Sequence, residues 1–239
     1  MADKHEIPDA ATSLEKPPGF ALEIEQPRKG YRYNQDPFHL AAFITSHALT
    51  WQAQLAGKCL DIGCGVGILP LLLARTLPLT KFTGLEIQEE LALLARNNVT
   101  RNRLSDRIKI INCDYRDCSR SEVAPLSFQT VICNPPYYQS TAGRLNTCPQ
   151  KRIARHEITG NIDSLTHAAA AFLDHQGLFI TIFPAARLLE LCSKLRAAKL
   201  EPKVIRFVHP ENSDRATMLL LAARKNGAPE IKVEPPLII

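Results

Sequence analysis

The amino-acid sequence predicts an α/β protein with a seven-stranded, mostly parallel sheet, helices on both faces and an antiparallel hairpin at one edge. Short apolar runs that are typical of buried strands alternate with longer runs that have helical spacing. A glycine-rich segment directly follows the first strand of this series, as it does in sheets that bind ligands at their strand ends. The last two strands follow one another without a long helix between them, which indicates the hairpin.

Length and composition fit one globular domain. The chain has 239 residues, a formal net charge of +5 and a pI near 8.8, which permits a polyanionic partner but does not require one. There is no apolar stretch of about 18 residues and no secretory leader, so we expect no membrane association and a cytoplasmic location. The seven cysteines lack the spacing of a zinc site, so we expect reduced thiols and no metal. The oligomeric state stays open between monomer and homodimer.

The two ends of the chain are expected to lie outside this domain. Residues 1–25 are polar and contain several prolines, which favours a flexible lead-in. Residues 226–239 are expected to form a C-terminal tail. The single domain is therefore predicted to span residues 26–225.

A helix is predicted near the start of the domain, over residues 37–49. Asp36 precedes Pro37, which is typical of an N-cap followed by proline in the first turn, and apolar residues then recur at helical spacing. Asp36, Tyr31 and Tyr33 either pack only on the core and cap the helix, or they lie over a cofactor. The sequence weighs these alternatives evenly.

A glycine-rich turn follows the strand predicted at 58–62. Glycine lets the backbone turn sharply and lets a ligand approach the main chain without a Cβ in the way. The motif is Gly-x-Gly-x-Gly, unlike the Gly-x-Gly-x-x-Gly of dinucleotide-binding proteins, and a carboxylate precedes it. A carboxylate suits a ligand with a positive amine or sulfonium better than a pyrophosphate. The candidate cofactor-binding residues here are Asp61, Gly63, Gly65 and Gly67.

Acidic residues follow the next two strands. Glu86 ends the strand predicted at 81–85, about 20 residues after the turn, the spacing at which an acid accepts hydrogen bonds from ribose hydroxyls. Ile87 can cover one face of an adenine. Asp114 follows the strand at 108–111 and either accepts from an adenine amine or caps a turn. These strand ends describe a pocket for an adenosine with a charged amino-acid tail, a description that S-adenosyl-L-methionine fits.

The segment that begins at Asn134 carries the candidate catalytic residues. The apolar run 131–133 is a predicted strand, and Pro135 and Pro136 end it because proline has no backbone N–H. The Asn134 side-chain oxygen and the Pro135 carbonyl can each accept a hydrogen bond from a substrate –NH2. Tyr137 offers a flat face on which a base can stack. The alternative is that Asn-Pro-Pro-Tyr is only a turn.

Positive residues follow this segment, between residues 139 and 160. Cations beside an amine site are well placed for phosphates, whose contacts dominate nucleic-acid affinity. The alternative is a solvated loop with ordinary salt bridges. The candidate substrate or RNA contacts are Tyr137, Tyr138, Arg144, Lys151, Arg152 and Arg155.

The remaining elements complete the alternation. A helix is predicted over 88–102, and its apolar side also carries an asparagine, Asn98. The later elements are helices at 162–174 and 185–198 and strands at 178–183, 203–208 and 217–222.

With residues 61–67, Glu86, Asp114 and 134–137 in this order, the sequence resembles the class I S-adenosylmethionine-dependent methyltransferases of amino groups, which have a Rossmann-like fold. The resemblance covers residues from about 28 to 224. Through its compact size, the segment 134–139 and the basic stretch 149–157, it also resembles the tRNA(Val) adenine-N6 methyltransferases, which modify the adenosine at position 37, next to the anticodon.

The resemblance implies a function, a cofactor and a partner. The function is N6-methylation of a tRNA adenosine, the cofactor is S-adenosyl-L-methionine and the partner is tRNA. Asp36 and Asn134 are then cofactor contacts as well. Asn134 and the Pro135 carbonyl orient the amine for direct in-line transfer, and Tyr137 stacks on the target base. The alternatives are methylation of rRNA guanine-N2 or of release-factor glutamine-N5, and a non-catalytic scaffold that binds S-adenosylmethionine or RNA.

Overall fold

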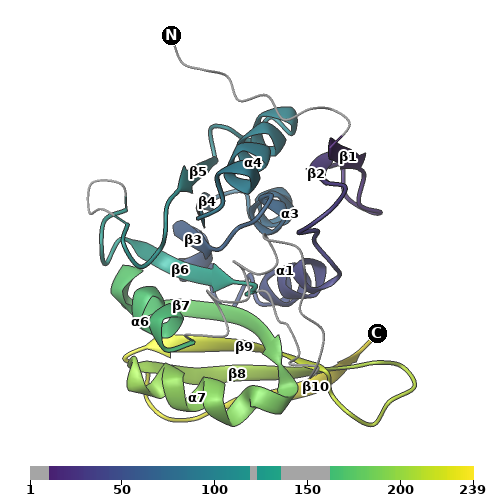
Figure 1. Ribbon diagram of the computed structural model, residues 1–239. Helices are drawn as coiled ribbons and strands as arrows, with labels where there is room; N and C mark the ends of the chain where they lie inside the picture. The colour runs from purple at the N-terminus through teal and green to yellow at the C-terminus, as the bar shows by residue number, and fades with distance from the viewer. Residues whose placement is uncertain (1–10, 119–122, 136–161) are drawn as a thin grey trace, which may run out of the picture.

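The computed structural model describes residues 11–118, 123–135 and 162–239. They form an eight-stranded mixed sheet with helices on both faces and a separate two-stranded hairpin (Figure 1). The predicted fold class is confirmed, with one strand more than the seven expected. The strands of the large sheet, in the order β10-β8-β9-β7-β6-β3-β4-β5, are β3 (Lys58–Ile62), β4 (Lys81–Glu86), β5 (Ile108–Asn112), β6 (Phe128–Cys133), β7 (Leu173–Pro184), β8 (Leu200–His209), β9 (Met218–Lys225) and β10 (Lys232–Ile238).

The helices pack on the two faces of this sheet. One core cluster joins α1, α3 and α4 to the face that carries Ile132, and a second joins α6 and α7 to the face that carries Val131. Neighbouring residues of a strand point to opposite faces, so both of these β6 side chains are buried. The helical elements are α1 (Asp36–Ser46), α2 (Gln52–Leu55), α3 (Ile68–Thr76), α4 (Glu89–Arg101), α6 (Ile162–Phe172), η2 (Ala185–Arg187) and α7 (Leu188–Ala197).

The direction of the strands brings their carboxyl ends together. β3, β4, β5, β6 and β7 run parallel in adjacent pairs, whereas β9 runs antiparallel between β7 and β8. The predicted antiparallel hairpin is therefore β8–β9, and β9 occupies its inner position. In open α/β sheets, ligands bind beyond the carboxyl ends of the parallel strands.

Both ends of the described chain contain structure that the sequence did not predict. Within the expected lead-in, β1 (Thr12–Glu15) pairs antiparallel with β2 (Ile24–Pro27). Within the expected tail, β10 pairs parallel with β8 and forms the outermost strand of the sheet. The eighth strand thus comes from residues whose polar and proline-rich sequence has no strand periodicity.

The start of α1 also differs from the expectation. Gln35 occupies the N-cap position without a side-chain hydrogen bond, and Asp36 is the first residue of the helix. The Asp36 carboxylate instead accepts from the Asn34 side-chain amide at 2.7 Å, which holds it away from the capping geometry. In the described part of the chain, no helix has the length and apolar character needed to cross a membrane.

Candidate active site

Strand register brings most of the candidate residues to one edge of the sheet. In the β3–β6 pair, Asp61 lies opposite Ile132, so Gly63 and Asn134 each follow two residues later on adjacent strands. In the β4–β5 pair, Glu86 lies opposite Asn112, and Asp114 follows two residues after Asn112. The turn after β3, the acid at the end of β4 and the segments after β5 and β6 therefore share the carboxyl edge.

The glycine turn between β3 and α3 folds back on β4. The backbone N–H groups of Gly63 and Cys64 both donate to the Leu85 carbonyl at 2.9 Å. Gly63, Gly65 and Gly67 all have positive φ values of 73°, 55° and 82°, which L side chains rarely adopt. A Cβ added at Gly63 meets no described atom within 4 Å, so this side of the turn faces open space.

Two carboxyl groups lie beneath the turn. Glu86 is 5% exposed and accepts from the backbone N–H groups of Gly65 and Gln88, both at 2.9 Å. Asp61 is 2% exposed, and its burial, together with the negative charge of Glu86, raises its pKa to about 8. The edge thus combines an acid held by backbone donors with a second acid that is protonated near neutral pH when no cation is nearby.

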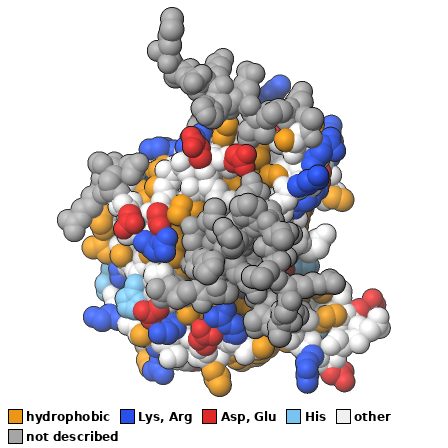
Figure 2. Space-filling model, viewed as in Figure 1, with side chains coloured by type: hydrophobic (Ala, Val, Ile, Leu, Met, Phe, Trp, Pro, Cys, Tyr) orange, Lys and Arg blue, Asp and Glu red, His pale blue; other side chains and the backbone are white. Residues whose placement is uncertain are grey.

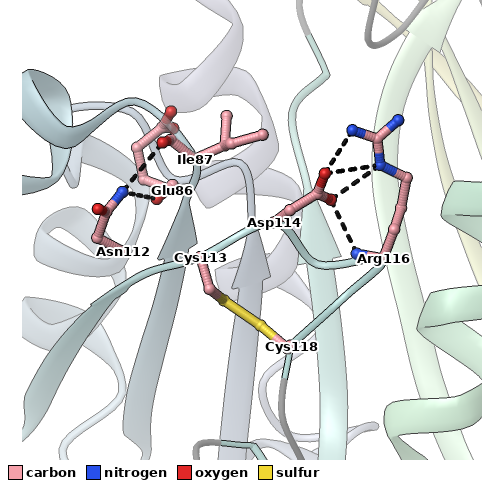
Figure 3. Close-up of a disulfide and its surroundings, with 7 residues drawn as sticks. All are labelled: Glu86, Ile87, Asn112, Cys113, Asp114, Arg116 and Cys118. Atoms are coloured by element: carbon pink, nitrogen blue, oxygen red, sulfur yellow. Dashed lines mark hydrogen bonds and ion pairs between the residues drawn. A yellow bond between two sulfur atoms is a disulfide. The ribbon is translucent and has the colours of Figure 1, made fainter.

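The next strand end is tied to Glu86 through the main chain. The Asn112 side-chain amide donates to the Glu86 carbonyl at 2.8 Å and to the Ile87 carbonyl at 3.0 Å (Figure 3). Ile87, directly after β4, is 37% exposed, whereas Phe82 and Leu85 within that strand are buried. An exposed isoleucine beside a buried acid can offer an apolar face to a flat ring.

Asp114 has a close partner that the sequence did not reveal. Its carboxylate accepts from the Arg116 backbone N–H at 2.9 Å and from Arg116 Nε at 2.8 Å, and it forms an ion pair with Arg116 Nη2 (Figure 3). The Arg116 hydrogen bonds and charge hold the Asp114 pKa below its usual range despite partial burial. The carboxylate is therefore ionised, and an adenine amine would share it with Arg116.

A disulfide closes the loop around Asp114. Cys113 and Cys118 are bonded, with their Cα atoms 5.9 Å apart, on the segment that follows β5 (Figure 3). The expectation of reduced thiols is wrong for this pair, because the loop returns close enough for the two side chains to meet. Cys59, Cys64, Cys133 and Cys192 are free thiols.

The candidate catalytic residues are only partly described. Asn134 is half-buried and Pro135 is buried, directly after the last residue of β6. Cys133 before them donates its thiol hydrogen to the Ile62 carbonyl at 3.1 Å, which ties the end of β6 to the end of β3. The other candidates for substrate or RNA contact lie outside the described residues: Tyr137, Tyr138, Arg144, Lys151, Arg152 and Arg155.

The segment before α1 reaches the glycine turn. A Cβ added at Gly65 would lie 2.8 Å from Tyr31 Cε1, so the Tyr31 ring covers this glycine. Tyr33 turns the other way, and its hydroxyl donates to Glu15 on β1 at 3.1 Å. Tyr31 thus lies against the turn, whereas Tyr33 reaches β1, and the Asp36 carboxylate accepts from the Asn34 side-chain amide.

Comparison with known proteins assigns this arrangement to a family. The sequence model of the family described as "Methyltransferase small domain" matches residues 44–183, which are 140 of the 239 residues. A Porphyromonas gingivalis protein named tRNA1(Val) (adenine(37)-N6)-methyltransferase is 32% identical over 171 residues, covering 71% of this chain and 65% of the relative. A protein of the same name from Escherichia fergusonii is 35% identical over 135 residues, covering 55% of this chain and 54% of the relative. The chain thus matches less than two thirds of these relatives' lengths.

Solved structures show the same fold at lower identity. A methyltransferase from Pyrococcus furiosus superposes with a TM-score of 0.59 at 19% identity, over 88% of this chain and 92% of that one. A T. thermophilus 16S rRNA guanine-N2 methyltransferase, solved with AdoMet and guanosine, gives a TM-score of 0.62 at 17% identity, over 90% of this chain and 50% of that one.

Proposed function

The chain belongs to the methyltransferase small domain family, and we propose that it methylates the N6 amine of an adenosine in tRNA, with S-adenosyl-L-methionine as the methyl donor. The relatives that support this choice of substrate are named for adenine 37 of tRNA1(Val). Because the matched regions cover only part of those relatives, the substrate and the tRNA partner are proposals for this chain. We propose a cytoplasmic location on the same basis.

The described residues fit S-adenosylmethionine. Asp61 and the turn from Gly63 to Gly67 would hold the amino-acid tail, since a buried carboxylate and open backbone suit an ammonium group. Glu86, whose carboxylate accepts from the backbone N–H groups of Gly65 and Gln88, would also accept from the ribose hydroxyls. The exposed side chain of Ile87 would cover the adenine, whose amine would reach Asp114, and Asp36 would contribute at the start of α1. When bound, the cofactor supplies an electrophilic methyl group on a sulfonium.

The residues after β6 would position the acceptor. The Asn134 side-chain oxygen and the Pro135 carbonyl accept hydrogen bonds from the two hydrogens of the amine, which directs the nitrogen lone pair toward the methyl group. The acceptors also stabilise the positive charge that develops on nitrogen during transfer. The amine needs no base before attack, because its proton can leave afterwards. Tyr137 would stack on the target base, and holding both reactants in line supplies most of the acceleration.

The observation that supports this proposal most directly is the register between β3 and β6. Asp61 lies opposite Ile132, and Gly63 and Asn134 follow at equal distance along adjacent parallel strands. A donor held on the glycine turn and an amine held by Asn134 would therefore meet at the same edge.

Recognition of tRNA would rely on residues outside the described ranges. Figure 2 shows both Lys or Arg and Asp or Glu side chains over the described part of the face in view. We therefore propose that Arg144, Lys151, Arg152 and Arg155 contact phosphates and that Tyr137 and Tyr138 contact bases, because phosphate contacts provide most nucleic-acid affinity.

Transfer of labelled methyl groups tests the proposal. Purified protein is incubated with labelled S-adenosylmethionine and separately with unmodified tRNA, ribosomal RNA and release-factor protein. We expect label in tRNA alone, at N6 of one adenosine by mass spectrometry. Label in ribosomal RNA or in protein would identify one of the other acceptors, and absence of transfer to all three, with intact cofactor binding, would favour a scaffold.

Substitution of the proposed amine acceptor gives a quantitative test. Asn134→Ala should slow methyl transfer by about 2.7–4 kcal/mol in the barrier, the cost of removing one hydrogen-bonding group from an oxyanion hole. Gln52→Ala removes an exposed amide near the opposite edge of the sheet and serves as the matched control. A loss below about tenfold in kcat for Asn134→Ala would contradict the assigned role.

A further inference from the structure

Asn98 joins three segments of the chain at a fully buried position. It lies on the inner face of α4 and is 0% exposed. Its side-chain oxygen accepts from the Glu25 N–H at 2.7 Å, and its amide donates to the Glu25 carbonyl at 2.8 Å and to the Val66 carbonyl at 3.0 Å. The side chain thus links α4 to strand β2 and to the glycine turn. A buried amide is costly unless its partners are satisfied, and both amide hydrogens and the oxygen are used here.

Asn102, one helical turn later, holds Glu23, the residue directly before β2, and its side-chain hydrogen bonds do not reach the glycine turn. It accepts from the Glu23 N–H at 2.9 Å and donates to the Glu23 carbonyl at 2.7 Å. Its second donated bond goes to the Asn98 carbonyl of its own helix at 2.8 Å. Each asparagine thus makes a pair of hydrogen bonds to the main chain of the N-terminal hairpin, Asn98 to Glu25 within β2 and Asn102 to Glu23 just before it. The Asn98 side chain also binds the glycine turn, whereas the Asn102 side chain does not.

The carbonyl that Asn98 holds belongs to the centre of the turn. Val66 is 0% exposed and lies between Gly65 and Gly67. A Cβ at Gly67 would lie 3.4 Å from the Ala95 side chain, so α4 supports the turn at two points, Ala95 and Asn98. From the other side, Tyr31 covers Gly65, and Glu86 accepts from its N–H. The turn is therefore held by three parts of the chain: α4, Glu86 at the end of β4, and the N-terminal segment that contains Tyr31.

We propose that Asn98 is a positioning residue for the cofactor site, which fixes the glycine turn by holding the Val66 carbonyl and couples strand β2 to it. The inference rests on the proposed binding of S-adenosylmethionine at this turn. Gly63, Gly65 and Gly67 must keep their positive φ values before the ligand binds. A buried hydrogen bond to the Val66 carbonyl limits the other backbone conformations that the turn could adopt. The N-terminal hairpin is then part of the cofactor site, although none of its residues is assigned to the ligand.

The pair Asn98→Ala and Asn102→Ala tests this role, because both variants lose two hydrogen bonds to the main chain of the N-terminal hairpin and only the first loses the bond to Val66. Amide hydrogen exchange is measured over residues 63–69 in the unliganded protein, and S-adenosylmethionine affinity is measured by calorimetry. We expect both variants to unfold at lower temperature. Only Asn98→Ala should exchange faster over residues 63–69 and bind the cofactor about threefold to tenfold more weakly.

Equal exchange rates over residues 63–69 and equal cofactor affinities in the two variants would overturn the inference. If Asn98→Ala does not fold, Asn98→Leu makes the same comparison against Asn102→Leu, because leucine has nearly the size and shape of asparagine, leaves no cavity and cannot donate to Val66. A wild-type protein that binds no S-adenosylmethionine would refute the proposed function. The exchange comparison in unliganded protein would still decide whether Asn98 holds the turn.

Discussion

The two ends of the described chain are attached to the domain by different kinds of interaction. The N-terminal hairpin β1–β2 lies beside α4, whereas β10 lies at the edge of the large sheet formed with β8 (Figure 1). At the N-terminal end, Leu22 and Ile24 are 3% and 0% exposed and belong to the core that contains α1, α3 and α4. The buried amides of Asn98 and Asn102 then hold Glu25 of β2 and Glu23 just before it.

The C-terminal strand is held mainly through its backbone. Its residues pair with β8 from Lys232 to Ile238, and Val233 and Ile238 are 62% and 55% exposed. Two side chains add to this pairing: Glu234 Oε1 lies 3.1 Å from His47 Nε2, and the partly buried Leu237 packs against the core cluster that contains α1. His47 itself stacks on Trp51 with ring centroids 4.2 Å apart.

This difference shows that two terminal segments of similar length can contribute differently to stability and to the candidate site. The hairpin buries apolar side chains and contacts the support of the glycine turn, so its loss affects both stability and the site. The outer strand covers the exposed edge of β8, and its main-chain hydrogen bonds contribute modestly because water competes for them. We therefore expect changes in the hairpin to be costly and changes in β10 to be mild.

Truncation of one side chain in each segment gives the largest expected contrast. Ile24→Ala should lower the free energy of unfolding by about 2–5 kcal/mol, because it removes buried methyl groups and leaves a cavity. Val233→Ala, at an exposed position of β10, should change it by no more than about 0.5 kcal/mol. Urea denaturation measures both. Similar losses in the two variants would contradict the assignment of hairpin and strand to different roles.

The sequence predicted the elements whose signals are local. β3 and β6 are apolar runs covered on both faces, and their carboxyl ends follow from the glycine turn and from the prolines after Asn134. β3 has the predicted bounds, whereas β6 begins three residues before the predicted 131–133. β10 escaped prediction because Pro235 and Pro236 interrupt its pattern, and its register with β8 shifts between Glu234 and Leu237. An edge strand tolerates proline because one side needs no N–H.

The site was predictable to the same extent. The acids and glycines at the strand ends could be identified from their positions directly after the predicted strands. The strand register then brings them to one edge of the sheet. The partners of these residues come from distant segments, so spacing cannot reveal them: Asn98 meets Glu25 across 73 positions. An amide on the apolar side of a predicted helix was the only signal for Asn98. Arg116 lies two residues after Asp114, but nothing in the sequence distinguished it from an ordinary solvent-exposed arginine.

Cofactor binding at the hairpin-supported turn should depend on pH. Asp61 has a raised pKa of about 8 in the unliganded protein, and a bound ammonium would favour its ionised form, so binding releases a proton. Affinity for S-adenosylmethionine should therefore rise from pH 5.5 to 7, by at most about tenfold per pH unit, in a range where the ligand's α-amino group stays protonated. Calorimetry in buffers of different ionisation enthalpy measures how many protons are released when the cofactor binds.

Removal of the titrating group supplies the control. Asp61→Asn should bind more weakly and without this pH dependence, whereas a flat profile in the wild type would rule out Asp61 as the ammonium partner. Stability of the unliganded protein should change in the opposite sense. Because the folded pKa lies above the unfolded value of about 3.9, the contribution of Asp61 is full below pH 4 and is lost as the pH rises toward 8.

The smallest effect is expected at the link between β10 and α1. Partial burial raises the Glu234 pKa, but the hydrogen bonds and charges of Lys232 and His47 outweigh it and hold the pKa below its usual value. Glu234→Gln should therefore cost less than about 1 kcal/mol of stability at pH 7, as is usual for a partly exposed ion pair. Because the folded pKa is depressed, this cost should shrink as the pH falls from about 4.3 through the folded pKa.

Urea denaturation between pH 3 and 7 measures the stability cost of Glu234→Gln, with the exposed Glu211→Gln as the matched control. Cofactor affinity should stay unchanged in both variants, and a weakened affinity in Glu234→Gln would show that the C-terminal strand, like the hairpin, supports the site.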